Sequence, residues 1–159
     1  MYDYIRYASP LGMLTLAARD GALTALVLDG QKYADHHLAG QGVEQETPLL
    51  HTARLWLDAY FAGERPDHSA LPLAPSGTAF QQRVWRELLT IPYGQTETYG
   101  SLAGRLGSSA RAVGSAVGRN PLSILIPCHR VLGADGSLTG YAGGVKAKET
   151  LLRLEGVLP

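Results

Sequence analysis

The sequence predicts an α+β fold in two units, a small sheet packed with one helix and then a mostly helical half. Two apolar runs flank Asp20 and Gly21, a dipeptide that favours the tight turn of a β-hairpin. A capped helix pattern follows over residues 47–63, and four shorter helix patterns occupy residues 78–121 and 145–156. These observations define the fold class.

The first unit begins with the hairpin, whose two strands lie within residues 13–30. Its helix has Thr47 as the N-cap, Pro48 at the first helical position and Gly63 as the stop signal. The apolar face of this helix is formed by Leu49, Ala53, Trp56, Leu57 and Tyr60. We expect this face to cover one side of the sheet.

A linker is predicted after the helix. Residues 64–77 contain three prolines and show no helical period, which is typical of a connecting segment. We therefore expect an N-terminal α+β domain over residues 1–75, with the linker starting near residue 64. A second domain is expected over residues 76–159.

The second unit is predicted to be mostly helical. Residues 78–91 form a first helix, which Pro92 ends. Two short helices follow, one capped by Thr98 and the other by Ser108 or Ser109, with a glycine in the turn between them. This arrangement is typical of a DNA-binding helix-turn-helix, although ordinary helical corners share the same signature.

The second of these short helices has a surface almost without side chains. The small residues on it are Ala110, Ala112, Gly114, Ser115, Ala116 and Gly118. A glycine inside a helix costs about 1 kcal/mol relative to alanine, so something must approach this backbone closely. One interpretation is another helix packed against it. The other is a narrow DNA groove, with Arg111 at the helix start reaching into the base stack.

The charge of the chain is unevenly distributed. The net charge is zero, but residues 1–70 hold nine acidic against five basic side chains, and residues 71–159 hold five acidic against nine basic ones. The stretch 98–134 contains four arginines and no carboxylate. It is suited to follow a polyanion, and equally to form a solvated face of a helical domain.

A single cysteine is placed in "ILIPCHRVLG" at residues 124–133. One cysteine forms no internal disulfide, and no zinc-finger spacing or CxxC pair exists, so we expect a cytosolic protein without a thiolate metal site. No secretory leader or membrane span is predicted. Cys128 is either a packed core residue or a nucleophile, and Pro127, His129 and Arg130 are each suited to hold or activate a thiolate. In an extended strand His129 points away from Cys128, so a turn or bridging water is required.

The last helix, residues 145–156, is predicted to bury Val145, Leu151 and Leu154. It carries lysines in its first turn and Glu155 in its last turn, the reverse of what the helix dipole favours. The effect is either weak and screened by solvent, or Glu155 is placed there to orient His129 as the third member of a thiol, imidazole and carboxylate relay.

Two segments, "FQQRVWRELLTIPYGQTETYGSLAGRLG" and "NPLSILIPCHRVLGADGSLTGYAGGVKAKETLLRLEG", resemble the O6-alkylguanine-DNA alkyltransferase family, also called methylated-DNA–protein-cysteine methyltransferases, and its bacterial Ogt-type members. The PCHR tetrad is specific to this context, and the match runs from about residue 78 to 156 and more loosely through the N-terminal part. The resemblance implies an RNase H-like N-terminal domain and a helical C-terminal domain with the helix-turn-helix.

The implied activity is repair of DNA by direct reversal. The alkyl group moves from O6 of guanine, or more weakly from O4 of thymine, onto the protein's own Cys128, irreversibly and once per molecule. By resemblance His129 is the base acting through water, Glu155 holds the imidazole, and Asn120 stabilises the turn leading to the active site. Tyr99 helps rotate the target nucleotide and supplies a hydrogen bond or proton to the leaving guanine.

The implied partner is double-stranded DNA that carries the alkylated base, entered from the minor groove. Arg111 is the finger that fills the gap in the duplex. The residues expected to touch DNA are Tyr99, Arg111, Ala112, Gly114, Ser115 and Arg119, and those expected to line the alkylguanine pocket are Val131, Tyr141, Ala142, Gly143 and Lys148. We expect a monomer, with binding side by side on DNA left open, and no cofactor, metal or membrane.

The chain departs from some relatives. Ala142 occupies a position where some members have serine, so only the backbone N–H remains to bond O6. Thr150 stands where many members carry tryptophan, a change that concerns packing. Some relatives hold zinc through N-terminal cysteines, which this chain lacks. Its histidines His36, His37, His51 and His68 are expected to be exposed or to lie in the linker.

Two other classes of function remain. A cysteine hydrolase would release its acylated thiol with water, need an oxyanion hole and turn over repeatedly. A binding-only protein would resemble the alkyltransferase-like proteins, which bind alkylguanine but lack the acceptor cysteine. The presence of Cys128 argues against the latter.

Overall fold

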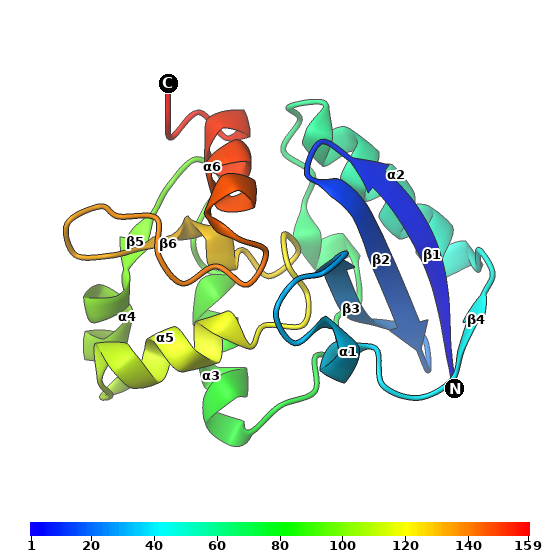
Figure 1. Cartoon of the computed structure of the whole chain (residues 1–159), viewed down its shortest axis with the longest axis horizontal. Coiled ribbons are helices and arrows are strands. Elements are labelled where there is room, and N and C mark those ends of the chain that lie inside the picture. The colour runs from blue at the N-terminus through cyan, green and yellow to red at the C-terminus, as the bar shows by residue number, and fades with distance from the viewer.

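Four strands of the N-terminal half form one sheet in the computed structural model, which describes residues 1–159 (Figure 1). The strands β1 (Tyr2–Ser9), β2 (Gly12–Arg19) and β3 (Ala22–Leu28) are antiparallel neighbours, and the short β4 (Gly42–Glu44) pairs parallel to β1. The order across the sheet is β3-β2-β1-β4. The predicted hairpin is β2 and β3, and the α+β class is confirmed.

The turn between β2 and β3 has the expected geometry. Asp20 has a φ of 52° and Gly21 a φ of 78°. Two successive left-handed residues form the turn type whose twist matches that of the flanking strands. The local sequence therefore determines this hairpin.

One face of the sheet is covered by α2 (Pro48–Phe61), while the short α1 (Ala34–His37) follows β3 (Figure 1). The helix begins as predicted, because the Thr47 side chain accepts a hydrogen bond from the Leu50 N–H. Gly63, with a φ of 85°, follows its end. The buried residues of α2 are Leu50, Ala53, Leu57 and Tyr60, so the face is close to the predicted one.

The C-terminal half contains α3 (Ala79–Leu88), α4 (Tyr99–Leu106), α5 (Ala110–Gly118) and α6 (Val145–Leu154). Side chains of Thr78, Thr98 and Ser109 cap the first three of these helices. Gly107 ends α4 in the left-handed conformation. Every helix falls short of the length and apolar character that a membrane span needs. The expectation that Val145 is buried is wrong, because it starts α6 with 55% of its surface exposed.

Two isolated strand-like contacts involve β3, and the second of them joins the two halves. The segment after α2 makes one 3₁₀ turn, His68–Ala70, and then pairs at Leu73 with Leu23 of β3. Beyond α5, Leu122 pairs with Leu26 of the same strand. A continuous cluster of 29 buried residues spans both halves. The turn that leads to Cys128 is therefore anchored on the N-terminal sheet.

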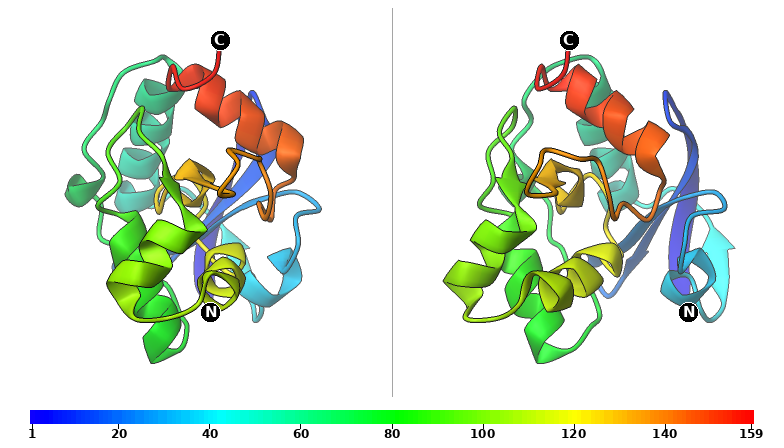
Figure 2. Two further views of the ribbon diagram at one scale, coloured as in Figure 1. Left: turned by 90° about the vertical axis from the view of Figure 1, so that its left-hand side faces the viewer. Right: turned by 60° about the vertical axis from the view of Figure 1, so that its left-hand side comes forward.

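A two-stranded parallel pair, β5 (Glu97–Thr98) with β6 (Val131–Leu132), connects the start of α4 to the segment that follows the thiol. In both views of Figure 2 the segment around residue 128 lies in the middle of the molecule, between α6 and α5. Elements from both halves surround the single cysteine.

Candidate active site

A tight turn between α5 and the thiol fixes the position of Cys128. The Asn120 side chain closes this turn, because its amide nitrogen donates to the Ile126 carbonyl at 2.8 Å and its amide oxygen accepts from the Leu122 N–H at 2.9 Å. Inside the turn Ile124 has a φ of 72°, a left-handed conformation that costs a β-branched residue about 1–3 kcal/mol. The hydrogen bonds of Asn120 and the burial of the turn hold this strained backbone in place.

The thiol lies in a protein interior. Cys128 is 4% exposed and begins the 3₁₀ turn Cys128–Arg130. Burial raises the pKa of the thiol, and the Asn120 amide and the Lys148 ammonium oppose that rise only in part. The resting sulfur therefore keeps its proton at neutral pH, and a base must accept the proton before sulfur attacks.

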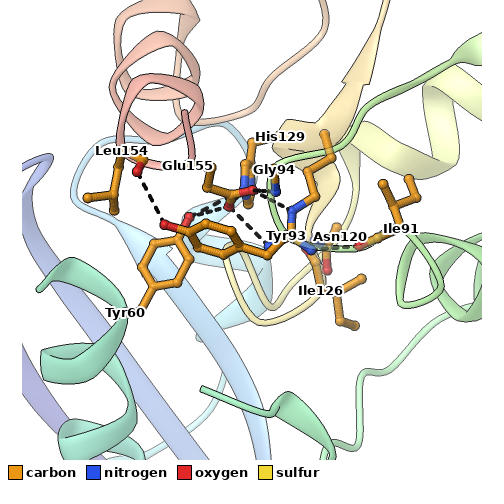
Figure 3. A network of polar contacts seen from close by, with 10 residues as sticks. Tyr60, Ile91, Tyr93, Gly94, Asn120, Ile126, His129, Leu154 and Glu155 are labelled. Atoms are coloured by element: carbon orange, nitrogen blue, oxygen red, sulfur yellow. Dashed lines mark hydrogen bonds and ion pairs between the residues drawn. The ribbon is translucent and has the colours of Figure 1, made fainter. Parts of the chain in front are cut away.

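The neighbouring imidazole is placed to act as that base. His129 is fully buried, and its Nε2 lies 2.6 Å from Oε2 of Glu155 (Figure 3). Its Nδ1 is also buried and has no hydrogen-bond partner in the protein. Because Nε2 must carry the proton to donate to the carboxylate, Nδ1 keeps a free lone pair. One nitrogen of the ring is thus available to accept a proton.

Opposite effects act on the two members of this pair. Burial lowers the pKa of His129, and the hydrogen bond and charge of Glu155 only partly oppose this. Burial alone would raise the pKa of Glu155, but hydrogen bonds from His129 and Arg130 hold it well below its ordinary value. The resting state is therefore a neutral imidazole beside an ionised carboxylate.

Arg130 binds Glu155 and does not contact the thiol, contrary to one expectation from the sequence. Its Nε donates to Oε1 of Glu155 at 2.8 Å, its Nη2 to Oε2 at 3.0 Å, and its Nη1 to the Ile91 carbonyl at 2.7 Å (Figure 3). The 3₁₀ turn directs both His129 and Arg130 toward this carboxylate. The guanidinium therefore neutralises Glu155 and does not activate the sulfur directly.

A tyrosine from the N-terminal half completes the surroundings of the carboxylate. The Tyr60 hydroxyl donates to Oε2 of Glu155 at 2.5 Å and lies 3.4 Å from Nε2 of His129 (Figure 3). The Gly94 N–H donates to Oε1 at 3.0 Å. Sequence reasoning placed Tyr60 only on the apolar face of α2, and no local signal marks its hydroxyl.

On the other side of the thiol, a buried lysine fixes the segment after β6. The Lys148 ammonium donates to the carbonyls of Val131 and, at 3.0 Å, Thr139. The Tyr99 hydroxyl donates to the same Thr139 carbonyl at 2.8 Å. Burial lowers the pKa of Lys148 to about 8, and burial followed by the charge of Cys128 raises the pKa of Tyr99 to about 12.

A cleft of about 310 Å³ opens between α5, residues 140–142 and residues 32–33. We call it the α5 cleft. Its lining residues are Lys32, Tyr33, Gly114, Ser115, Gly118, Gly140, Tyr141 and Ala142. A larger hollow of about 480 Å³ lies beside Tyr2, Tyr4 and Arg6 on the N-terminal sheet, but none of its lining residues is a predicted site residue. The α5 cleft is lined by two residues expected to touch DNA, Gly114 and Ser115, and by two expected to line the alkylguanine pocket, Tyr141 and Ala142.

The remaining predicted residues lie around this cleft with different roles. Arg111 is exposed at the start of α5, and Ala112 is half-buried beside it. Arg119, just after α5, stacks its guanidinium 4.3 Å from the ring centre of Tyr33. Gly143 lies against the Tyr141 ring, where an added Cβ would come within 2.8 Å of it. The contribution of Tyr33 was not foreseen, because it comes from the N-terminal half.

The buried neutral imidazole predicts a loss of stability on acidification. Below pH 6.5, the ordinary pKa, the unfolded chain binds a proton on His129 while the folded chain leaves it neutral. Its contribution is therefore fully present above pH 6.5 and falls by up to about 2 kcal/mol at pH 5. Glu155 adds a further loss below pH 4.5, where only the unfolded carboxyl is protonated.

Urea denaturation at pH 7.5, 6 and 5 measures how the free energy of unfolding depends on pH. His37 also makes the protein less stable as the pH falls, because burial lowers its pKa to about 4. The variant His37→Gln removes this contribution, so that the remaining pH dependence of stability in this range comes from His129. A free energy of unfolding of His37→Gln that is constant from pH 7.5 to 5 would contradict the prediction.

Two family models match the chain. The model for the ribonuclease-like domain of 6-O-methylguanine DNA methyltransferase matches residues 2–75, and the model for the DNA binding domain of the same protein matches residues 79–157. Together they span almost the whole sequence.

Curated proteins and solved structures agree with these matches. A methylated-DNA–protein-cysteine methyltransferase of Mycolicibacterium paratuberculosis is 47% identical over 157 residues, covering 98% of this chain and 93% of the relative. One of Haemophilus influenzae is 44% identical, covering 96% and 85%. The crystal structure of Mycobacterium tuberculosis OGT in complex with DNA superposes with a TM-score of 0.84 at 45% identity, covering 99% and 95%.

Proposed function

Because the chain belongs to the 6-O-methylguanine DNA methyltransferase family, we propose that it repairs alkylated DNA with Cys128 as the acceptor of the alkyl group. Members of this family are methylated-DNA–protein-cysteine methyltransferases, and this chain performs direct reversal of DNA alkylation. The observation that carries the assignment of Cys128 is its burial next to an imidazole that is itself held by a carboxylate.

The transfer is a displacement at the alkyl carbon. The Cys128 proton passes through a water molecule to Nδ1 of His129, whose imidazolium Glu155 stabilises. The sulfur forms a bond to the carbon while the bond from carbon to O6 of guanine breaks. The electron pair of that bond stays on guanine, and the Tyr99 hydroxyl gives it a hydrogen bond or a proton. The thioether on Cys128 has no leaving route, so each molecule reacts once.

The substrate is an alkylated base turned out of a DNA duplex. A thiol that is 4% exposed cannot reach a base within the stack, so the nucleotide must rotate into the protein through the α5 cleft. Tyr141, Ala142, Gly143 and Lys148 line its pocket, and the backbone of Cys128 and Val131 reads the base edge. O6-alkylguanine is the main lesion and O4-alkylthymine the weaker one.

The duplex lies against α5 and against Tyr99 at the start of α4, with α5 in the minor groove and Arg111 in the gap left by the rotated nucleotide. Tyr99, Ala112, Ser115 and Arg119 contact DNA near it. The protein acts as a monomer in the cytoplasm, where a reducing environment keeps the acceptor thiol free. Sequence-specific contacts are unnecessary, because the rotated base is identified in the pocket.

The glycines of α5 support an outside partner, since internal packing does not require them. A Cβ at Gly114 would lie 3.7 Å from the Tyr99 ring, and one at Gly118 would lie 3.9 Å from the Gly140 carbonyl, both ordinary contacts. A bare surface that costs helix stability and relieves no internal clash is explained by close approach of the duplex.

The variant Gly114→Ala should therefore become more stable and bind DNA less well. Alanine should raise the free energy of unfolding by up to about 1 kcal/mol, since it restores helix propensity without a clash. Its methyl group stands between α5 and the duplex, so affinity for DNA should fall several-fold. Urea denaturation and fluorescence anisotropy with a labelled duplex measure the two effects.

The matched control is Gly104→Ala, which adds the same methyl group to a glycine of α4 with open space around it. It should gain stability and keep the wild-type affinity for DNA. Unchanged DNA affinity in Gly114→Ala would show that the bare face of α5 does not meet the duplex.

Incubation with a duplex that carries labelled O6-methylguanine tests the proposed function. One label per protein molecule should move from DNA to protein. After tryptic digestion, peptide 120–130, which contains Cys128, should gain the mass of one methylene unit. Repeated turnover with an unchanged protein mass, as a hydrolase would show, overturns the assignment.

A further inference from the structure

Tyr60 belongs to α2, in the half of the molecule that the transfer chemistry leaves unused, yet its hydroxyl reaches the carboxylate behind the candidate base. We propose that Tyr60 is a positioning residue, through which the N-terminal domain sets the basicity and orientation of His129 by its hydrogen bond to Glu155. The inference rests on the proposed function, because it assigns Tyr60 a part in the same proton transfer.

The contacts form one connected network (Figure 3). Oε2 of Glu155 accepts from Tyr60 at 2.5 Å, from His129 at 2.6 Å and from Arg130 at 3.0 Å. The Tyr60 oxygen, whose own proton points to the carboxylate, turns a lone pair toward Nε2 of His129 at 3.4 Å. Two acceptors therefore flank the Nε2 proton, and both favour the tautomer that leaves Nδ1 free.

Tyr60 remains a donor over the whole range in which the protein works. Burial and then the charge of Glu155 raise the pKa of its hydroxyl far above the ordinary value. The side chain is 1% exposed, and its ring packs between Trp56, whose ring is 5.6 Å away, and Tyr93 at 6.0 Å. A fixed ring and a fixed proton make the bond to Glu155 a permanent feature of the site.

The other charged and titratable groups around the pair come from several elements. They are Arg130 and Cys128 of the 3₁₀ turn, Lys148 of α6, Tyr93 after α3, Arg65 stacked on Tyr93, and Tyr141 beyond β6. The positive charges of Arg130 and Lys148 both lower the pKa of His129. Among these groups only Arg130 donates to Glu155. The Tyr93 hydroxyl donates to the Leu154 carbonyl instead, so it does not replace the bond from Tyr60.

The hydrogen bond has a definite electrostatic sign. A donor on Oε2 disperses the negative charge of Glu155 and so weakens its stabilisation of the imidazolium. Removing the donor concentrates that charge and raises the pKa of His129. Strengthening the donor has the opposite effect. The pH at which protonation of His129 stops alkyl transfer should follow these changes.

The test is the pH dependence of the single-turnover rate constant for methyl transfer from a duplex with O6-methylguanine. In Tyr60→Phe the midpoint of the acid limb should move upward by roughly half a pH unit or more. The control is Tyr7→Phe, which removes a partly buried hydroxyl that donates to a different carboxylate, Asp58, at 2.7 Å. Its midpoint should equal that of the wild type.

A second variant keeps the size and the hydrogen bond of the side chain. Replacement of Tyr60 by 3,5-difluorotyrosine makes the hydroxyl a stronger donor, so the midpoint should move downward. Because this residue fills the same space, the result is available even where Tyr60→Phe fails to fold. Shifts of opposite direction in the two variants support the inference, since loss of stability alone moves no midpoint.

The inference is overturned if the protein with 3,5-difluorotyrosine has the same acid-limb midpoint as the wild type. It is also overturned if Tyr7→Phe shifts this midpoint as much as Tyr60→Phe does. In both cases the proposed function still stands if peptide 120–130 of the wild-type protein gains the methyl group after incubation with the alkylated duplex. If peptide 120–130 of the wild-type protein gains no methyl group, both the proposed function and the inference are overturned.

Discussion

The variant Cys128→Ser is expected to lose methyl transfer below detection while it still binds the alkylated duplex. A hydroxyl is far less acidic than a thiol, so a neutral imidazole cannot generate the corresponding anion, and oxygen is the poorer nucleophile toward an alkyl carbon. The side chain differs by one atom at a buried position, so the turn held by Asn120 should keep its shape. Label transfer to protein and anisotropy of a labelled duplex measure the two properties.

The control is Cys128→Ala, which removes the heteroatom and should give the same two results. Both variants should bind the O6-methylguanine duplex in a complex in which no methyl transfer follows. Release of the methyl group from DNA by Cys128→Ser would show that sulfur is not the acceptor. Loss of duplex binding in Cys128→Ser alone would show that the thiol also maintains the DNA-binding surface.

Local features of the fold are predictable because neighbouring residues determine them. The left-handed pair Asp20 and Gly21 sets the hairpin, and the side chains of Thr98 and Ser109 cap α4 and α5. The strand β1 has no comparable signal, since aromatic residues occur on both of its faces and blur the alternation. The three exposed residues of β4 are held by backbone pairing with β1, which no side-chain pattern records.

The candidate site shows the same division between local and long-range information. An acidic residue at a helix C-terminus opposes the helix dipole, which marks Glu155 in the sequence, and in the structure Arg130 and His129 donate hydrogen bonds to its carboxylate. The sequence pattern predicts an extended segment at residues 128–130, whereas these residues form a 3₁₀ turn that directs Arg130 toward Glu155. No local pattern predicts the role of the Tyr60 hydroxyl, because its partner Glu155 is 95 residues away along the chain.

The variant Glu155→Gln should destabilise the protein by about 3–5 kcal/mol, because it leaves the buried Arg130 guanidinium without its counter-charge. Such a loss is a large share of the 5–15 kcal/mol that holds a typical domain folded. Methyl transfer should also slow, since the amide no longer stabilises the imidazolium of His129. Urea denaturation at pH 7.5 and the single-turnover rate constant measure the two losses.

A double-mutant cycle separates the ion pair from the rest of the site. Arg130→Met alone leaves the carboxylate with His129, Tyr60 and the Gly94 N–H, so it should cost less than Glu155→Gln. Combining Arg130→Met with Glu155→Gln removes both charges, and the double variant should be more stable than the sum of the single losses by about 2 kcal/mol. Methyl transfer should stay slow in the double variant, because the imidazole still lacks its carboxylate. Additive losses of stability would show that the guanidinium finds another partner when Glu155 is neutral, and that the pair is not what holds the 3₁₀ turn in place.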